Sequence, residues 1–342
     1  MSRFFTLKNL VPYTPGEQPS LNDYIKLNTN ENPYPPSKNV RNVLNGGNLH
    51  LYPDPKCSKL TKAFSDYYNI DKEEVIFANG SDEILAFCYF AFCKDKVAFP
   101  SISYGFYEVY ANLFELESNK IPLLSNFKIN PANYLRLNQT IIIANPNAPT
   151  GIALSVSDIE IILEHNPNNI VIIDEAYSDF GEVTCRQLIN KYDNLVVVGT
   201  FSKSRNLAGA RLGYAIANKE VISDLQVVRN SFNPYNVNTL TQALGVASIE
   251  DDEYFKSCTQ KIVEERQRFI TNLDKLGYMT LESGANFVFT KHKSLSGEQL
   301  YTELRSNKIL VRYFDKIKDY VRITIGTPEQ MAYVIKVMEG LN

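Results

Sequence analysis

The sequence predicts an α/β fold in which a mostly parallel sheet lies between helices, with a second, smaller α+β domain after it. Apolar runs alternate with helical patterns over the first two thirds of the chain, which is typical of a doubly wound parallel sheet. After about residue 245 the pattern changes to a long charged helix followed by short strands. The chain of 342 residues is also too long for one small domain.

Five apolar runs are the expected strands of the first sheet, and they lie at residues 74–80, 96–100, 140–146, 169–177 and 194–202. Such runs show little alternation, which suits strands that are covered on both faces. Ser155 and Asp158 resemble a capping box and predict the start of a helix between two strands. In the later part we expect helices near 252–276, 296–306 and 328–340, and short strands within 278–283, 285–292, 309–314 and 320–326.

These patterns divide the chain into three parts. We expect an N-terminal segment at 1–30 that packs with the small domain, a large domain at 31–245 that binds the cofactor inferred below, and a small domain at 246–342. The large domain holds the mostly parallel sheet, of the seven-stranded type.

Composition excludes several classes of protein. The chain is 44% hydrophobic and 21% charged, as in ordinary globular proteins, and its net charge of −3 gives no reason to expect nucleic acid or a membrane as partner. Five cysteines show no CxxC pair and no metal-ligand spacing with the three histidines, so we expect reduced thiols, a cytoplasmic protein and no metal. The sequence also lacks GxxxxGK[ST], GxGxxG after a strand, HExxH and GxSxG.

Polar residues follow the predicted strands where each strand ends. Residues 79–83 open a helix, so the amides of Ser81 and Asp82 and the Ser81 hydroxyl suit a phosphate, although the same stretch also fits an ordinary N-cap. Asp174 ends an apolar run, where a carboxylate needs a cationic or donor partner. The end of the fifth expected strand carries Thr200 and Ser202, and Lys203 and Arg211 come after it. This stretch also fits a solvated turn between a strand and a helix.

One ligand satisfies all of these side chains. Pyridoxal phosphate needs a lysine amine that binds its aldehyde, a carboxylate facing its ring nitrogen, and hydroxyls, amides and an arginine around its phosphate. Tyr104, which follows the expected strand 96–100, supplies a flat aromatic cover for the ring. A carboxylate opposite the ring nitrogen keeps that nitrogen protonated, so the ring can accept the electrons that are released when the α-proton of a substrate leaves.

Residues 199–218, GTFSKSRNLAGARLGYAIAN, resemble the cofactor-lysine signature of the class II aminotransferases of fold type I. Seven other motifs occur in the order expected of histidinol-phosphate aminotransferases, and the resemblance spans about residues 24–328. They are LNTNENPYPPS, LYPDPKCSKL, NGSDEIL, NPNAPTGI, IIDEAY, SGANFVF and VRITIGT.

The resemblance implies a role for each matching residue. Lys203 binds the cofactor covalently and then moves the proton, Asp174 pairs with the pyridine nitrogen, and Tyr177 donates to the phenolic oxygen of the ring. Tyr104 stacks on the ring. The phosphate-binding residues implied are Ser81, Asp82, Thr200, Ser202 and Arg211.

Further residues are implied at the substrate and at a second subunit. Tyr52 resembles a tyrosine that reaches the cofactor phosphate of the neighbouring subunit, which implies a homodimer, but it equally fits a tyrosine packed beside a proline-rich turn. Tyr235 is a candidate from the partner chain and Asn30 a candidate for the substrate pocket, and turn or packing roles also fit both. Arg322 resembles the arginine that binds the substrate anion. Arg312, ten residues earlier, fits either an adjacent strand facing the same anion or a solvated position.

One position departs from the family. Ala148 stands just before PTG, where many relatives have an asparagine that donates to the phenolic oxygen. Asn147 is no simple replacement, because adjacent residues of an extended segment point to opposite sides. Tyr177 is then the donor that remains, and a lost donor raises the pKa of the lysine-linked cofactor nitrogen.

The resemblance implies a dimeric, pyridoxal-phosphate-dependent aminotransferase whose small-molecule substrates are an amino donor and a 2-oxo acid. The expected reaction exchanges the amino group between L-histidinol phosphate and 2-oxoglutarate in histidine biosynthesis. An aromatic amino-acid aminotransferase and an amino-acid O-phosphate decarboxylase of the same fold remain alternatives, since both share the cofactor residues. A non-catalytic binding protein or regulator is a further alternative from another class, and it would lack a bound cofactor.

Overall fold

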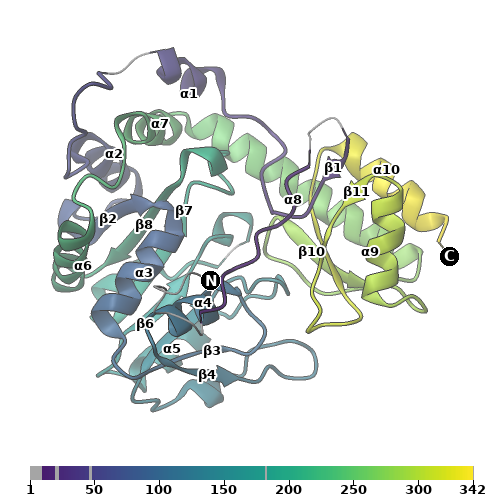
Figure 1. Cartoon of the computed structure of the whole chain (residues 1–342), viewed down its shortest axis with the longest axis horizontal. Helices are drawn as coiled ribbons and strands as arrows, with labels where there is room; N and C mark the ends of the chain where they lie inside the picture. Colours follow the sequence, from purple (N-terminus) through teal and green to yellow (C-terminus); the bar gives the residue numbers. More distant parts are fainter. Residues whose placement is uncertain (1–9, 20–22, 46–47, 182, 342) are drawn as a thin grey trace, which may run out of the picture.

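The computed structural model describes residues 10–19, 23–45, 48–181 and 183–341, and it consists of two lobes built on separate sheets. The large lobe contains a seven-stranded sheet in the order β2-β8-β7-β6-β5-β3-β4. Figure 1 shows this lobe on the left, the small lobe on the right, and a long helix, α8, that runs from one to the other. The observed α/β architecture agrees with the predicted fold class.

The strands of the large sheet begin and end as follows: β2 (Val75–Asn79), β3 (Lys96–Pro100), β4 (Glu117–Ile121), β5 (Thr140–Ala144), β6 (Val171–Asp174), β7 (Leu195–Thr200) and β8 (Leu212–Ala217). Neighbouring strands from β4 to β7 are parallel, whereas β8 is antiparallel to both β2 and β7. All five strands expected from the apolar runs are therefore present. The sheet also contains β4 and β8, which those runs did not indicate.

Helices cover both faces of the large sheet: α1 (Lys38–Asn42), α2 (Ser58–Tyr68), α3 (Gly80–Phe92), α4 (Phe106–Leu113), α5 (Val156–Glu164), α6 (Lys219–Phe232) and α7 (Thr239–Glu250). Short 3-10 turns occur at Val43–Asn45, Lys72–Glu74, Pro131–Tyr134, Ser178–Phe180, Arg186–Asn190 and Ala208–Ala210. Ser155 caps α5 in the predicted box with Asp158. Alternate residues of the buried strands contribute to two cores, one on each face, because successive side chains of a strand point to opposite sides.

The small lobe combines a short segment near the N-terminus with the last part of the chain. Its antiparallel sheet has the order β12-β13-β10-β9, with strands Arg312–Tyr313, Val321–Thr324, Phe287–Lys291 and Met279–Thr280. The helices α8 (Asp252–Lys275), α9 (Gly297–Ser306) and α10 (Pro328–Glu339) complete it. Near the N-terminus, β1 (Ile25–Lys26) pairs in parallel with β11 (Ile309–Leu310), and Leu27 enters the core of this lobe.

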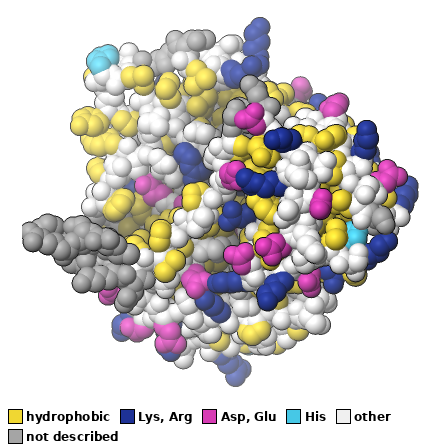
Figure 2. Space-filling view, turned by 45° about the vertical axis from the view of Figure 1, so that its right-hand side comes forward, with side chains coloured by type: hydrophobic (Ala, Val, Ile, Leu, Met, Phe, Trp, Pro, Cys, Tyr) yellow, Lys and Arg dark blue, Asp and Glu magenta, His cyan; other side chains and the backbone are white. Residues whose placement is uncertain are grey.

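The surface carries charges of both signs. Figure 2 shows Lys and Arg side chains interspersed with acidic ones, and hydrophobic side chains gathered at the upper left of that face. Within the described ranges, no helix has the length and apolar character needed to cross a membrane.

Candidate active site

Two adjacent cavities, which share lining residues, lie at the carboxyl ends of the parallel strands, where open α/β sheets bind ligands. The smaller one, here called the inner cavity, measures about 140 Å³, and the outer cavity measures about 570 Å³. Both are lined by Tyr104, Ala148, Tyr177 and Lys203. The inner cavity brings together these predicted residues: Ser81, Asp82, Tyr104, Asp174, Tyr177, Thr200, Ser202, Lys203 and Arg211.

Lys203 lies between the two cavities, three residues after the end of β7. Its Nζ donates to the backbone oxygen of Thr29 at 3.1 Å, and the Asn32 side chain donates to the backbone oxygen of Lys203 at 3.1 Å. Burial lowers the pKa of Lys203 to about 8, and the nearby Arg322 charge acts in the same direction. A lysine amine with a lowered pKa is a better nucleophile at neutral pH than an ordinary surface lysine.

Asp174 ends β6 and is 5% exposed. The Tyr107 hydroxyl donates to Oδ2 at 2.8 Å, and the Ala176 N–H donates to Oδ1 at 3.1 Å. Burial raises the pKa of Asp174 to about 6, and these two donors oppose that rise. The carboxylate therefore has fixed donors on the protein side and suits a cationic partner on the cavity side.

Tyr107 was not among the predicted site residues. It follows Tyr104 by three positions at the start of α4, and its ring stands at 88° to the Tyr104 ring. Tyr104 precedes α4, which begins at Phe106, so no helical periodicity relates the two tyrosines and the sequence alone did not indicate Tyr107.

The other end of the inner cavity suits an anion. Gly80 begins α3 with a φ of +79°, and a Cβ atom there would lie 2.5 Å from Nη2 of Arg211. Arg211 Nη2 donates to Asp82 Oδ2 at 2.9 Å, and the Tyr104 hydroxyl donates to Asp82 Oδ1 at 2.9 Å. The Asp82 carboxylate thus orients Arg211 and Tyr104, and it is the Asp82 backbone amide in the first helical turn that suits an anion.

The Ser202 hydroxyl is buried without a hydrogen-bond partner among the described residues. An unpaired buried hydroxyl costs free energy unless a ligand satisfies it. Ser202, together with Ser81, Thr200 and Arg211, lines the cavity at the start of α3. This donor set fits the phosphate of pyridoxal 5'-phosphate, while Asp174 and Lys203 fit its ring nitrogen and its aldehyde.

Position 148 offers no donor to the inner cavity, as the sequence indicates. The neighbouring Asn147 is 1% exposed, and its amide donates to the Ile102 backbone oxygen at 3.0 Å and to Thr150 Oγ1 at 3.2 Å. Ser103 donates to the Asn147 side-chain oxygen at 2.8 Å. Asn147 is thus engaged within the loop, which agrees with the expectation that it does not replace the missing asparagine.

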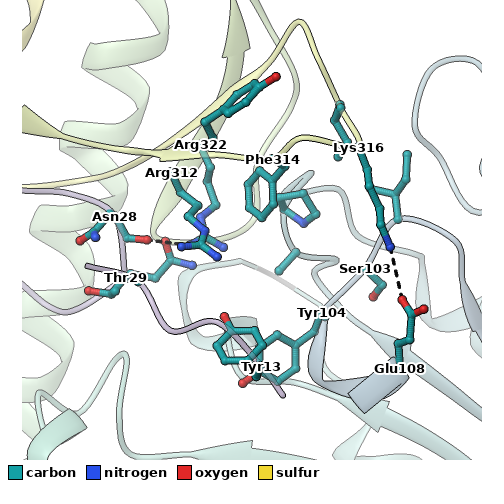
Figure 3. Close-up of a pocket in the computed structure, with 18 of the residues that line it drawn as sticks. Tyr13, Asn28, Thr29, Ser103, Tyr104, Glu108, Arg312, Phe314, Lys316 and Arg322 are labelled. Carbon is teal, nitrogen blue, oxygen red and sulfur yellow. Dashed lines mark hydrogen bonds and ion pairs between the residues drawn. The ribbon is translucent and has the colours of Figure 1, made fainter. Parts of the chain in front are cut away.

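Arg312 and Arg322 face the outer cavity from directly paired positions of β12 and β13. Figure 3 shows the two guanidinium groups side by side, with Arg322 Nη2 donating to the Asn28 backbone oxygen at 2.9 Å. Burial lowers the pKa of Arg322, and the adjacent Arg312 charge adds to this. The Arg322 Nε is buried without a partner among the described residues, so the pair suits an anion.

The outer cavity also contains residues that the motifs did not indicate. Tyr13, from the irregular N-terminal segment, lies with its ring centroid 6.2 Å from that of Tyr104. At the other side Glu108 accepts from Lys120 at 2.5 Å and from Lys316 at 3.4 Å, the second of which is drawn in Figure 3. No motif or periodic pattern of the sequence indicates Tyr13, or Glu108 with its two lysines, as part of a site.

Asn30 lines the outer cavity, but Tyr52 and Tyr235 lie outside the linings of both cavities. The two tyrosine rings stack on each other at 4.7 Å with an angle of 22°. Tyr52 is 82% exposed and Tyr235 is 42% exposed. In a single chain, neither side chain contributes to the site.

Comparisons with known proteins agree with this geometry. Residues 22–338 match the family "Aminotransferase class I and II". A histidinol-phosphate aminotransferase of Brachyspira hyodysenteriae is 49% identical over 95% of this chain and 94% of its own length. One of Clostridium beijerinckii is 46% identical over 98% of this chain and 96% of its own length.

A solved structure shares the fold. The histidinol-phosphate aminotransferase of Sinorhizobium meliloti in complex with pyridoxal-5'-phosphate has a TM-score of 0.88 at 20% identity, over 100% of this chain and 99% of that one. The family match and the two relatives each cover nearly the whole chain. The protein belongs to the class I and II aminotransferase family.

Proposed function

We propose that this aminotransferase exchanges the amino group between L-histidinol phosphate and 2-oxoglutarate, with pyridoxal 5'-phosphate as cofactor, in histidine biosynthesis. Relatives of 46–49% identity that carry this activity in their names support the substrate assignment. The observation that carries the proposal is the arginine pair over the outer cavity, because two guanidinium groups with an unpartnered buried Nε suit a dianionic phosphate.

When bound, pyridoxal 5'-phosphate supplies an electron-accepting ring that stabilises the charge left on the substrate α-carbon after proton loss. In our proposal Asp174 holds the ring nitrogen in its protonated form, and Tyr177 donates to the phenolic oxygen. Tyr104 covers the face of the ring. The phosphate is bound by Ser81, Thr200, Ser202, Arg211 and the Asp82 amide at the start of α3.

Lys203 has two tasks in this proposal. Its Nζ would hold the cofactor through the aldehyde, and its free amine would take the proton from the substrate α-carbon. A pKa of about 8 suits both tasks, since the amine is then poised near neutral pH to lose and regain a proton.

The substrate anions bind to the arginine pair. Arg312 and Arg322 together bind the phosphate of histidinol phosphate, and Arg322 binds the carboxylate of glutamate in the other half-reaction. Both anions thus use one site, as a reaction with two alternating substrates requires. Asn30 lines the same cavity.

We propose that the active enzyme is a homodimer in which Tyr52 and Tyr235 contribute to the partner's site. Their exposure, their mutual stacking and their distance from the cavity linings of their own chain support this. We propose a domain boundary at 30/31, which the pairing of β1 with β11 supports. The boundary proposed from the sequence at 245/246 falls inside α7, so we place it instead between α7 and α8, at Asp251. A cytoplasmic location is proposed on the ground that all five cysteines are free.

The test of the substrate is a half-reaction. Candidate amines are mixed with the yellow holoenzyme, and conversion of its absorbance band to that of the pyridoxamine form is followed. Rapid conversion by histidinol phosphate is expected. Faster conversion by phenylalanine would instead indicate an aromatic amino-acid aminotransferase, and carbon dioxide release from an amino-acid O-phosphate would indicate a decarboxylase.

A substitution checks the arginine pair. Arg312→Ala is expected to raise KM for histidinol phosphate on the order of tenfold or more, because a bond between charged groups contributes about 1.5–3 kcal/mol. The matched control is Arg305→Ala, which removes an arginine on α9 that pairs with Glu17. An equal effect of both substitutions on KM would contradict the assignment.

A further inference from the structure

Asn30 is a buried residue at the junction of the two lobes, with a φ of 58° and 1% exposure. Its backbone N–H donates to Thr324 Oγ1 at 3.1 Å, and its backbone oxygen accepts from Asn286 Nδ2 at 2.9 Å. The Thr324 hydroxyl donates to Asn30 Oδ1 at 3.0 Å. Because Oδ1 accepts from the threonine, the amide nitrogen of Asn30 is directed toward Tyr177.

That amide nitrogen donates to the hydroxyl oxygen of Tyr177 at 2.9 Å. A tyrosine hydroxyl has one proton to donate, and an incoming donor on its oxygen directs that proton elsewhere. Among the described residues, no protein atom accepts a hydrogen bond from the Tyr177 hydroxyl. Tyr177 lines the inner cavity. The proton is therefore available to a ligand there.

The position of the Tyr177 ring is fixed by apolar contacts. The Phe287 ring packs edge-on at 5.1 Å and 89°, and Tyr177 packs against the cluster that Phe287 forms with Ala148 and Ala285. The Ala148 side chain has no hydrogen-bond donor to offer the inner cavity that it lines. Since Asn147 is engaged within its own loop, the direction of the Tyr177 proton carries more weight in this chain.

We propose that Asn30 is a positioning residue for Tyr177, which fixes the tyrosine hydroxyl proton as the donor toward the phenolic oxygen of the cofactor. This inference rests on the proposed function, because it requires the bound cofactor. It also gives Asn30 a role other than contact with substrate. Asn30 acts through Tyr177, and Thr324 holds the Asn30 amide in the orientation that this needs.

The test is a spectrophotometric pH titration of the holoenzyme, in which the midpoint of the absorbance change of the Lys203-bound cofactor is measured. Asn30→Asp keeps the shape of the side chain but turns its donor into an acceptor, which draws the Tyr177 proton away from the cofactor. The midpoint is expected to rise by about one unit or more, because a lost donor to the phenolic oxygen favours the protonated cofactor. Asn30→Ala is expected to raise it less.

A rescue separates positioning from a general structural effect. Ala148→Asn supplies a second donor, so the double variant Asn30→Asp with Ala148→Asn is expected to return toward the wild-type midpoint. Thr324→Val, which releases the Asn30 amide, is expected to raise the midpoint in a chain with an intact Asn30. Thr324→Ser keeps the hydroxyl, so its midpoint is expected to equal that of the wild type. These two variants decide the question if the Asn30 variants fail to fold.

An unchanged midpoint in Asn30→Asp, or in Thr324→Val, with the cofactor band present would overturn the inference. A lower melting temperature without a change of midpoint would do the same, because it would indicate packing alone. Failure of the proposed function is a separate result. It would appear as a wild-type protein without a cofactor band, or with a band that no amino donor converts.

Discussion

Burial changes the pKa of two neighbouring residues in opposite directions. The pKa of Lys203 falls to about 8 and that of Asp174 rises to about 6, in each case because burial disfavours the charged form. The two groups thus titrate close to neutral pH, which is where an acid–base residue is most effective. Both pKa shifts are expected to affect how the cofactor-free protein binds its cofactor at different pH values.

Covalent uptake of the cofactor is expected to accelerate as pH rises through about 8. Only the neutral amine of Lys203 attacks an aldehyde, and its lowered pKa makes that form abundant more than two pH units below the usual range for lysine. Apoprotein is mixed with pyridoxal 5'-phosphate over a pH series, and the rate of borohydride-trapped adduct is measured. A midpoint above 10 would contradict the lowered pKa. Lys203→Ala is the control without an adduct.

Tyr107→Phe is expected to weaken cofactor binding at slightly acidic pH. The Tyr107 hydroxyl stabilises the ionised form of Asp174, so its loss raises the Asp174 pKa further above about 6, by about one unit. The affinity for the cofactor then falls at a higher pH than in the wild type, which fluorescence titration measures. Tyr89→Phe is the matched control, because its hydroxyl bonds to the Tyr107 backbone oxygen instead of Asp174. Identical pH profiles of Tyr107→Phe and the wild type would contradict this role.

At this scale the sequence predicted residues that directly follow strands. Asp174, Ser202 and Lys203 follow apolar runs, and parallel strands deliver such residues to one edge. Asn30 was predicted only to line the substrate pocket, and its bond to Tyr177 depends on the relative position of two lobes. Tyr13 lies in an irregular segment, where no periodicity predicts a neighbour.

At the scale of elements, the start of α3 depends on one glycine. Gly80→Ala is expected to weaken cofactor binding on the order of tenfold or more, since its Cβ would displace Arg211. Gly277→Ala is the matched control, because Gly277 has a φ of +78° and no atom within 4 Å of an added Cβ. Both substitutions are expected to cost about 1 kcal/mol of unfolding free energy from backbone strain. Equal cofactor affinities by titration, with both variants folded, would contradict the contact.

Two strands of the large sheet, β4 and β8, were not predicted from apolar runs, and each has a physical reason. β8 is buried at every residue and begins directly after a turn at Arg211, which has a φ of 53°. Its apolar residues lie within the cofactor-lysine motif 199–218, so they do not form a separate apolar run in the sequence. β4, with the sequence ESNKI, lies at the edge of the sheet. An edge strand that is partly exposed needs few apolar residues, and its main signal is then absent.

At the scale of the whole molecule, exposed hydrophobic side chains offer candidate positions for the interface of the proposed homodimer. Tyr52 is joined in this set by Phe90, Val227 and Phe232, which are 70%, 64% and 76% exposed. Phe232 ends α6 and contacts Phe87 of α3 by an edge-on ring contact at 6.3 Å. Single exposed apolar residues are common, so the position of the proposed interface has to be tested by substitution.

Phe232→Asp is expected to convert a dimer to a monomer, because a buried unpaired charge destabilises an interface. Sedimentation velocity measures the change. Tyr333→Asp is the matched control on α10 of the small lobe, where the side chain is 41% exposed. A dimer that persists in Phe232→Asp, or a wild-type monomer with full activity, would contradict the shared site.

The pairing of β1 with β11 joins the first and last parts of the chain, and this sets the sequence of events during translation. The residues of the inner cavity lie between positions 81 and 211, so the ribosome releases all of them before either arginine of the outer cavity. Domains generally fold in order of their synthesis. During synthesis the inner cavity is therefore expected to form before the arginine pair of the outer cavity. β1 can pair only after β11 has been synthesised.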